Sequence, residues 1–320
     1  MLSRVAGNIY WMARYLERAE DMARLINVNA NLTLDLPKGL SPIWGQLVAI
    51  TGAGDVYKGD YEERSVLKFL ISDTSNWCSI VACLSYAREN ARTIRDVIPR
   101  EVWECINTTY LNAKDNAPQA LTKRGRYPFL QDIITSTQML TGILAGTMNH
   151  DAGYTFLKIG RNLERADMTS RIIDTRSANL VPDATTTKAT YDNLQWMSVL
   201  KSLTGYQMYR REMQVRIQRQ EVLKFLIRST AFPRAIAHCM NEVEASLKGL
   251  PGHEKPLLAI HRIKRQLDAV EIEKLKQAEL QHFMDQLQVG FACLHQELQL
   301  CFFGGAYETA DVSASMTQSA

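Results

Sequence analysis

Arg14-Tyr15-Leu16-Glu17-Arg18-Ala19, close to the N-terminus, returns in the middle of the chain as Arg161-Asn162-Leu163-Glu164-Arg165-Ala166. The two copies are 147 positions apart (164 − 17), a little less than half of the 320 residues. An internal repeat of this length predicts the same arrangement of elements twice. The pattern therefore predicts a tandem duplication of a unit of roughly 150 residues.

A second pair of segments extends the repeat beyond the first helix. The sequence from Val66 to Ile71 is the same as that from Val222 to Ile227, at an offset of 156 positions. A drift of the offset from 147 to 156 is expected if small insertions followed the duplication. We predict a first helical repeat over 1–150 and a second over 151–303 that packs with the first as one pseudo-twofold body. The stretch 304–320 is rich in Gly, Ser, Thr and Ala and is predicted to be a disordered tail.

Helical periodicity dominates the rest of the chain. From Ile9 to Ile26 the apolar residues step by three and four positions, which is typical of one buried helix face. Pro99 is expected to end one helix and open the next, and Asp151 to cap the second Glu-Arg helix. Strand-like alternation is nearly absent, so the sequence predicts an all-α bundle. Further helical patterns cover Arg100–Asn112, Gln131–Met148, Tyr154–Arg176, Tyr206–Arg228, Pro233–Leu250 and Leu257–Phe302, the last with a break near Ala269.

The composition limits the classes of function. The chain is 46% apolar and 22% charged, as in an average globular protein, and its net charge of +3 is too small to indicate a nucleic-acid or membrane partner. No apolar run approaches the ~18 residues of a membrane span, and no signal peptide is evident. Glycine-rich phosphate loops and the common hydrolase motifs are missing, and we assign no metal site and no cofactor. The six cysteines lack CxxC spacing and are predicted to be buried, reduced thiols in a cytoplasmic protein: Cys78, Cys83, Cys105, Cys239, Cys293 and Cys301.

The repeated Glu-Arg motif is the first candidate site. A buried Glu or Arg needs a partner, and the simplest pseudo-twofold arrangement pairs Glu17 with Arg165 and Glu164 with Arg18. One interpretation is a structural ion-pair network that fixes how the two halves meet. The other is a polar site in which Glu17 and Glu164 act as acid, base or ligand and the motif arginines bind a carboxylate or phosphate. The members are the anion- or partner-binding candidates Arg14, Arg18, Arg161 and Arg165, and the structural i,i+4 pairs Glu20–Arg24 and Asp167–Arg171.

A second candidate lies further along the first half. Arg88, Arg92 and Arg95 follow apolar positions at helical spacing and form a cationic ridge beside the buried face. Such a ridge could bind an anion or an acidic partner helix, or it could be a solvated face paired with Glu89 and Asp96. The corresponding stretch of the second half has no arginine, which indicates that the two halves have different functions. Phe232-Pro233-Arg234 is interpreted as ordinary capping at a helix start.

The sequence resembles the alpha-E domain family of bacterial helical proteins, which are named for their Glu-Arg motif. The resemblance covers nearly the whole chain and rests on both Glu-Arg helices, the stretch Ala87–Arg92, Trp103 with Asn107, and Phe232-Pro233-Arg234. The chain departs from the family pattern at one turn. The second half has Arg234-Ala235-Ile236, whereas the first half has Cys78-Ser79-Ile80 and lacks the arginine.

The resemblance implies a set of partners rather than a reaction. Members of the family typically lie beside, or are fused to, a circularly permuted ATP-grasp protein, often with a transglutaminase-like protease nearby. It therefore implies a helical accessory protein of an ATP-dependent amide or peptide ligase, with a charged groove between its repeats. Two alternatives stay open: an enzyme in its own right that uses Glu17 or Glu164 as general acid or base on a peptide or amino-acid amide, and a structural scaffold. The oligomeric state is left open.

Overall fold

The computed structural model describes residues 2–35, 44–178, 186–213 and 216–304. All regular secondary structure in these residues is helical, which confirms the all-α prediction. The first half contains α1 (Ser3–Asp35), α2 (Gly45–Thr51), α3 (Glu63–Ile71), α4 (Ile80–Thr93), α5 (Arg100–Ala120) and α6 (Lys123–Thr147). The second half contains α7 (Ala152–Ala178), α8 (Thr186–Ser202), α9 (Tyr206–Met213), α10 (Arg219–Arg228), α11 (Ile236–Leu247), α12 (Glu254–Ala269), the 3-10 helix η1 (Ile272–Lys274) and α13 (Gln277–Phe302).

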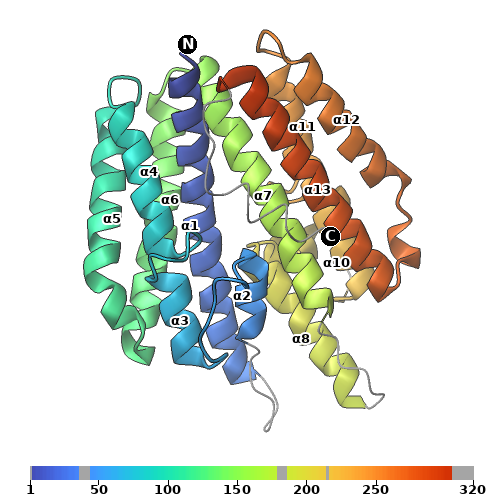
Figure 1. Ribbon diagram of the computed structural model, residues 1–320. Helices are drawn as coiled ribbons and strands as arrows, with labels where there is room; N and C mark the ends of the chain where they lie inside the picture. Colours follow the sequence, from blue (N-terminus) through green and yellow to red (C-terminus); the bar gives the residue numbers. More distant parts are fainter. Residues whose placement is uncertain (1, 36–43, 179–185, 214–215, 305–320) are drawn as a thin grey trace.

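The two Glu-Arg helices, α1 and α7, lie side by side at the centre (Figure 1). Helices α4, α5 and α6 lie on the side of α1, and α11, α12 and α13 lie on the side of α7. Tyr10 and Trp11 of α1 are buried, as expected for a helix that carries large aromatic residues and is surrounded by protein. The centre of the molecule is thus formed by the two segments that the sequence repeats.

Gly160 is the point of closest approach between α1 and α7. A Cβ atom added at this glycine would overlap the carbonyl oxygen of Tyr10, so the backbones could not come as close with any other residue. The aromatic end of α13 closes the same region, because Phe303 packs against both Tyr10 and Phe156.

Neighbouring helices follow the same order in both halves. Helix α1 contacts α4, α6 and α8, and α7 contacts α11, α13 and α2. The boundary predicted near residue 150 falls between the end of α6 at Thr147 and the start of α7 at Ala152. This order is what a tandem duplication would produce, but the duplication itself remains a prediction. Of the predicted tail, only Gly304 belongs to the described residues.

Most predicted helices are present, with one clear correction. The Asp151 carboxylate accepts from the backbone N–H of Gly153 at 2.8 Å and caps α7, and α12 ends at Ala269, where a break was expected. The single helix predicted over Tyr206–Arg228 is wrong, because α9 ends at Met213 and α10 begins at Arg219. The amphipathic pattern runs through this break because both helices bury apolar residues in the same core.

The predictions about cysteine burial and about membrane-spanning helices can also be compared with the structure. Cys78, Cys83 and Cys239 are buried and Cys105 is partly buried, but Cys293 and Cys301 are exposed on α13, so the prediction of burial is wrong for these two. Their positions lie on the solvent side of a helix whose apolar stripe is formed by other residues. Among the described residues, no helix combines the length and apolar character that a membrane span requires.

Candidate functional site

Glu164 of α7 lies at the centre of a buried polar cluster between α1 and α7. Arg14 donates from Nε to Oε2 of Glu164 at 2.6 Å, and Arg18 donates from Nε to Oε1 at 2.6 Å and from Nη2 to Oε2 at 3.2 Å. Both oxygens of the carboxylate are therefore held by guanidinium groups. Helix α1 can supply both arginines because positions 14 and 18 are one turn apart on the same face.

The pairing keeps Glu164 ionised despite its burial. Burial by itself would raise the pKa of the Glu164 carboxyl, but the charges and hydrogen bonds of Arg18 and Arg14 lower it to about 2. The pKa of Arg18 is raised well above its ordinary value, since the attraction of Glu164 outweighs the effect of burial. A carboxylate held in this way is a poor proton acceptor near neutral pH.

Tyr10 and His295 extend the cluster toward α13. The Tyr10 hydroxyl lies 2.8 Å from Nδ1 of His295 and accepts from Nη1 of Arg14 at 3.3 Å. Burial raises the pKa of Tyr10 to about 12, and burial together with repulsion from Arg14 lowers the pKa of His295 to about 3. Because Arg14 occupies the phenol oxygen, the phenol proton is available to Nδ1, which leaves the proton of the neutral imidazole on Nε2.

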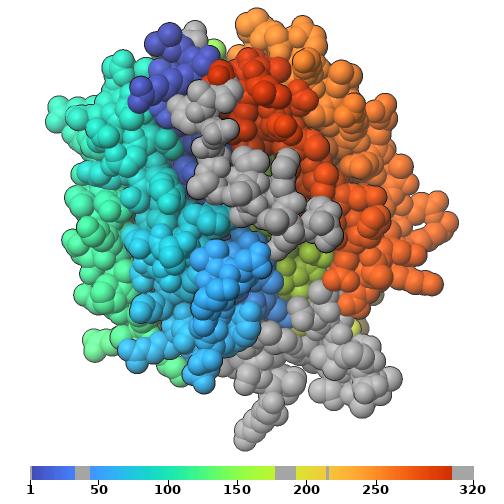
Figure 2. All heavy atoms as spheres, viewed as in Figure 1, coloured from blue at the N-terminus to red at the C-terminus, as the bar shows by residue number. Residues whose placement is uncertain are grey.

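A cavity of about 120 Å³ adjoins Glu164. Its lining comes from α1, α2, α7, α13 and the turn before α4, and Figure 2 shows part of α7 at the surface between α2 and α13. Asp167, Arg171 and Gln288 are the partly exposed charged or amide residues of the lining, so this edge of the cavity is the one closest to solvent.

Glu17 occupies the corresponding position in α1, but its surroundings differ. Its Oε1 accepts from Nε of Arg165 and pairs with Nη2 of Arg234, both at 2.8 Å. Burial opposes ionisation of Glu17, and the charges of Arg165 and Arg234 nevertheless keep its pKa below the ordinary value. The reciprocal pairs expected from the sequence, Glu17 with Arg165 and Glu164 with Arg18, are thus both present in the structure.

Arg234 is the site residue that the sequence analysis missed. It was interpreted as part of ordinary helix capping, which is wrong: its buried guanidinium binds Glu20 at 3.0 Å and also contacts Asp21 and Glu17. The backbone of Arg234 is held in turn, because Thr169 donates to its carbonyl oxygen at 2.9 Å. The absence of an arginine at the equivalent position of the first half was the one signal that could have indicated its importance.

Asp21 is the third acid on this single guanidinium. Burial raises the pKa of the Asp21 carboxyl to about 8; Arg234 lowers it, but Glu17 and Glu20 repel its charge. Its Oδ2 atom is buried and has no hydrogen-bond partner among the described residues. We therefore expect Asp21 to carry a proton near neutral pH, while Glu17 remains ionised.

The space beside Glu17 is almost completely filled. Only about 20 Å³ remains, lined by Thr137, Leu140, Thr141 and Leu144 of α6 and by Leu157 and Arg161 of α7. The α6 residues correspond one by one to the α13 residues beside Glu164, which are Gln288, Phe291, Ala292 and His295, each 151 positions later (288 − 137). At this offset of 151 positions, Leu144 corresponds to His295. At the offset of 147 positions that relates the two Glu-Arg motifs, Leu157 corresponds to Tyr10.

The remaining motif residues also have partners. The i,i+4 pairs Glu20–Arg24, at 2.8 Å, and Asp167–Arg171, at 3.1 Å, are both formed. The pKa of Arg161 is lowered by burial and by repulsion from Arg165, and the charge of Glu17 acts in the opposite direction.

The cationic ridge does not join this centre. Arg88 donates to Oδ1 of Asn107 at 2.7 Å and lies over Trp103, Arg92 pairs with Glu89 at 2.8 Å, and Arg95 also lies over Trp103. These partners come from α4 and α5 alone. The ridge faces α5 and the Glu-Arg pairs lie between α1 and α7, so the structure does not bring these two candidate groups together.

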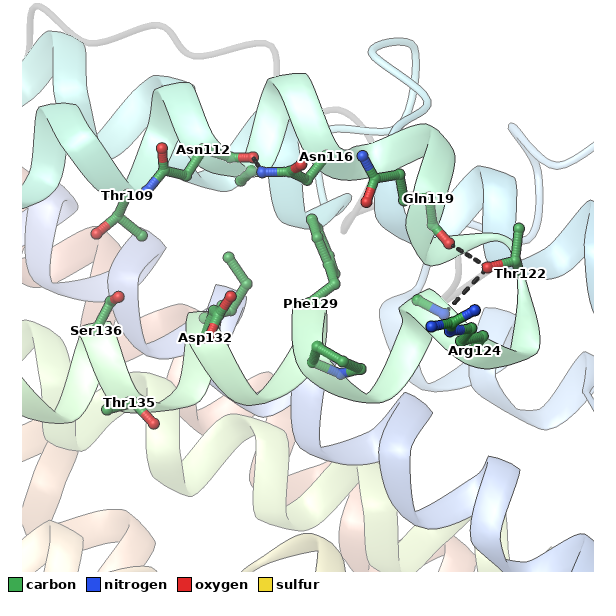
Figure 3. Close-up of a pocket in the computed structure, with 14 residues that line it drawn as sticks. Thr109, Asn112, Asn116, Gln119, Thr122, Arg124, Phe129, Asp132, Thr135 and Ser136 are labelled. Carbon is green, nitrogen blue, oxygen red and sulfur yellow. Dashed lines mark hydrogen bonds between the residues drawn. The ribbon is translucent and has the colours of Figure 1, made fainter.

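A groove of about 770 Å³ lies elsewhere, between α5 and α6 (Figure 3). Amide and hydroxyl side chains such as Asn112, Asn116 and Ser136 face across it, and Phe129 and Asp132 project from α6. It contains no Glu-Arg residue, and none of the described side chains with a buried unpartnered polar atom lines it. The smaller cavity beside Glu164 is therefore the stronger candidate site.

Comparison with known proteins agrees with this architecture. Residues 1–303 match the alpha-E family, described as a predicted alpha-helical domain with a conserved ER motif, and the chain belongs to this family. Uncharacterised proteins of Mycobacterium bovis and Mycobacterium tuberculosis are 24% identical to it over 321 aligned positions. The alignments cover 92% of this chain but 36% of each relative, so the chain spans about a third of their length. No solved structure matches the chain.

Proposed function

We propose that the chain is a helical accessory protein of an ATP-grasp amide or peptide ligase and that it presents the polar centre between α1 and α7 to the ligase or to its product. The observation that carries the proposal is the state of the two signature carboxylates. Glu17 and Glu164 are each held by two guanidinium groups, with pKa values below the ordinary range. Carboxylates held in this way stay ionised and can fix neighbouring helices or bind cationic groups. A general acid or base must instead exchange a proton near the working pH.

The length of the mycobacterial relatives supports a partnership. This chain accounts for 36% of each of them, so the same domain is joined there to a much longer sequence. A domain that is joined to further sequence in its relatives is expected to work beside other domains. The resemblance to the alpha-E family favours a circularly permuted ATP-grasp protein as that partner, with a transglutaminase-like protease as a further candidate.

The exposed ridge on α4 is the surface that we assign to the ligase. The Arg92 side chain is 57% exposed, and its one recorded ion pair is with Glu89 of its own helix. Guanidinium groups at this spacing suit an acidic helix or loop of a partner. The cavity beside Glu164 lies on other elements and would remain accessible in such a complex.

The test uses the full chain and the ATP-grasp protein of the same organism. We expect the two to co-elute in size-exclusion chromatography and the chain to change the rate of ATP turnover by the ligase. Arg92→Glu is expected to weaken the complex, whereas Lys274→Glu, a charge reversal at a 79% exposed side chain of η1, serves as the matched control. A ligase that neither binds the chain nor changes its turnover contradicts the proposal.

A further inference from the structure

The lining of the cavity beside Glu164 has an excess of hydrogen-bond donors. Arg18 uses Nε and Nη2 on Glu164, and its Nη1 is buried without an acceptor in the described part of the chain. The same holds for Nε1 of Trp11 and Nε2 of Gln288, and all three side chains line this cavity. An unpaired buried donor costs free energy, so three of them around one space indicate that an acceptor is bound there.

The arrangement of Arg18 fixes the direction of its free edge. The side chain is 6% exposed, and its guanidinium lies 4.7 Å from the ring centroid of Trp77. Stacking on the indole and the paired hydrogen bonds to Glu164 together hold the guanidinium plane, and Nη1 belongs to the edge that Glu164 leaves free. This is a preformed donor for an oxygen ligand rather than a mobile surface charge.

The charge of the lining indicates one negative charge on the ligand. Three arginines and two acids leave an excess of one positive charge, and burial and Arg14 keep His295 neutral by lowering its pKa to about 3. The charged lining residues are Arg14, Arg18, Arg171, Glu164 and Asp167. A planar carboxylate has about four acceptor sites, enough for the three unpartnered donors of the lining, whereas a phosphate dianion would place a second negative charge beside Glu164.

The apolar part of the lining limits the size of the ligand. It is formed by Ile50, Leu163, Met168, Phe291 and Ala292. The volume of about 120 Å³ is close to the ~150 Å³ of an engineered cavity that holds benzene. A group of a few carbon atoms therefore fits beside the carboxylate, but a nucleotide does not.

We propose that the cavity beside Glu164 is a binding site for one carboxylate group that carries a small apolar substituent. The inference concerns this chain alone and does not depend on the ligase partner. The opposite half makes no such site, since about 20 Å³ remains beside Glu17 and a single unpartnered donor, Nε of Arg161, borders it. Two sources share this chemistry: a free carboxylic acid and the C-terminal carboxylate of a peptide.

The experiment is calorimetric titration of the full chain, without any ligase, with propionate, propionamide and inorganic phosphate as probes. We expect one saturable propionate site per chain and at least about tenfold weaker binding of the neutral amide and of phosphate, because each loses or opposes charged hydrogen bonds. Alanyl-alanine and its C-terminal amide distinguish the sources: preference for the peptide acid over propionate indicates a chain end, and the reverse a free acid.

Variants connect the binding to these donors. Trp11→Phe removes the indole N–H with little change of shape and is expected to weaken propionate binding about tenfold, as is Gln288→Leu. Trp196→Phe, the same change at a buried tryptophan of the second half, is expected to leave binding unchanged. Near-UV circular dichroism confirms folding of each variant. No saturable binding at about 10 mM propionate, tighter binding of phosphate, or equal binding by Trp11→Phe, Gln288→Leu and the unchanged chain overturns the proposal.

Discussion

Around Glu17 the polar side chains close into a filled network, whereas around Glu164 they border a cavity of about 120 Å³. The ion pair across the α1–α7 interface is the same in both places. The difference comes from the residues next to this ion pair. The Glu17 side has Arg234 where the Glu164 side has Cys78. It also has Leu144 in place of His295 and Leu157 in place of Tyr10. The comparison teaches that a repeated motif can hold an interface twice, while substitutions beside one copy make room for a ligand.

The largest expected effect is on the Glu17 side, at Arg234. Arg234→Ala leaves Glu17, Glu20 and Asp21 buried without the guanidinium that they share, and we expect a loss of about 3–5 kcal/mol in the free energy of unfolding. Urea denaturation measures this. Cys78→Ala, at the matched position of the Glu164 side, is expected to cost about 1 kcal/mol. Equal losses for the two variants would remove the distinction between a closed and an open half.

The next effect concerns Glu164 and its dependence on pH. The pKa of Glu164 falls from 4.5 to about 2 on folding, so its ionised form stabilises the folded state by about 3 kcal/mol above pH ~4.5. This contribution is lost as the pH falls through the interval from about 4.5 to 2. Glu164→Gln is therefore expected to lose about 3 kcal/mol at pH 7 and to lose less near pH 2.

The same variant separates binding from catalysis. A general acid or base at Glu164 predicts loss of activity in Glu164→Gln with an unchanged melting temperature, and the same would hold for Glu17→Gln. The pairing seen here predicts that the melting temperature falls for both variants. Thermal denaturation together with an activity assay distinguishes the two outcomes.

A smaller effect is expected where the two central helices meet. Gly160→Ala would place a methyl group on the carbonyl oxygen of Tyr10, and we expect a loss of about 1–3 kcal/mol as α1 and α7 separate. Gly142→Ala on α6 is the control, because a Cβ there meets nothing within 4 Å. A helix-interior alanine should then stabilise by up to about 1 kcal/mol. Equal effects of the two changes in chemical denaturation would contradict the close approach of α7 to the backbone of α1 at Tyr10.

An effect of opposite sign is expected at Asp21. Its pKa in the folded protein, about 8, exceeds that of the unfolded chain, so the folded state holds a proton that the unfolded state releases, and stability falls as the pH rises from about 4 to 8. Asp21→Asn removes this dependence and is expected to stabilise the protein at pH 7. A stability curve that keeps its slope between pH 5 and 8 in this variant would show that Asp21 is ionised.

The sequence predicted the parts of this account that rest on repetition and helical spacing. The offset of 147 positions and the rule that buried charges need partners led to the Glu17–Arg165 and Glu164–Arg18 pairs. Asp151 and Pro99 marked the starts of α7 and α5 because capping is local, whereas the prediction that Pro99 also ends the preceding helix is wrong, since α4 ends at Thr93. Arg234 was missed because its partners lie more than 200 positions away, and no local pattern shows that a turn before α11 reaches α1. The unequal cavities depend on Leu144 and His295. These two residues are recognised as counterparts only once the structure shows that α6 packs beside Glu17 as α13 packs beside Glu164.

The most direct test of the difference between the halves is the indole N–H region of a two-dimensional ¹⁵N–¹H NMR spectrum during titration with propionate. Trp11 lines the cavity beside Glu164, and Trp196 is buried in the second half outside it. We predict a saturable shift of the Trp11 Nε1–H resonance and an unchanged Trp196 resonance. An unchanged Trp11 resonance, or shifts of the same size for both indoles, would contradict the account.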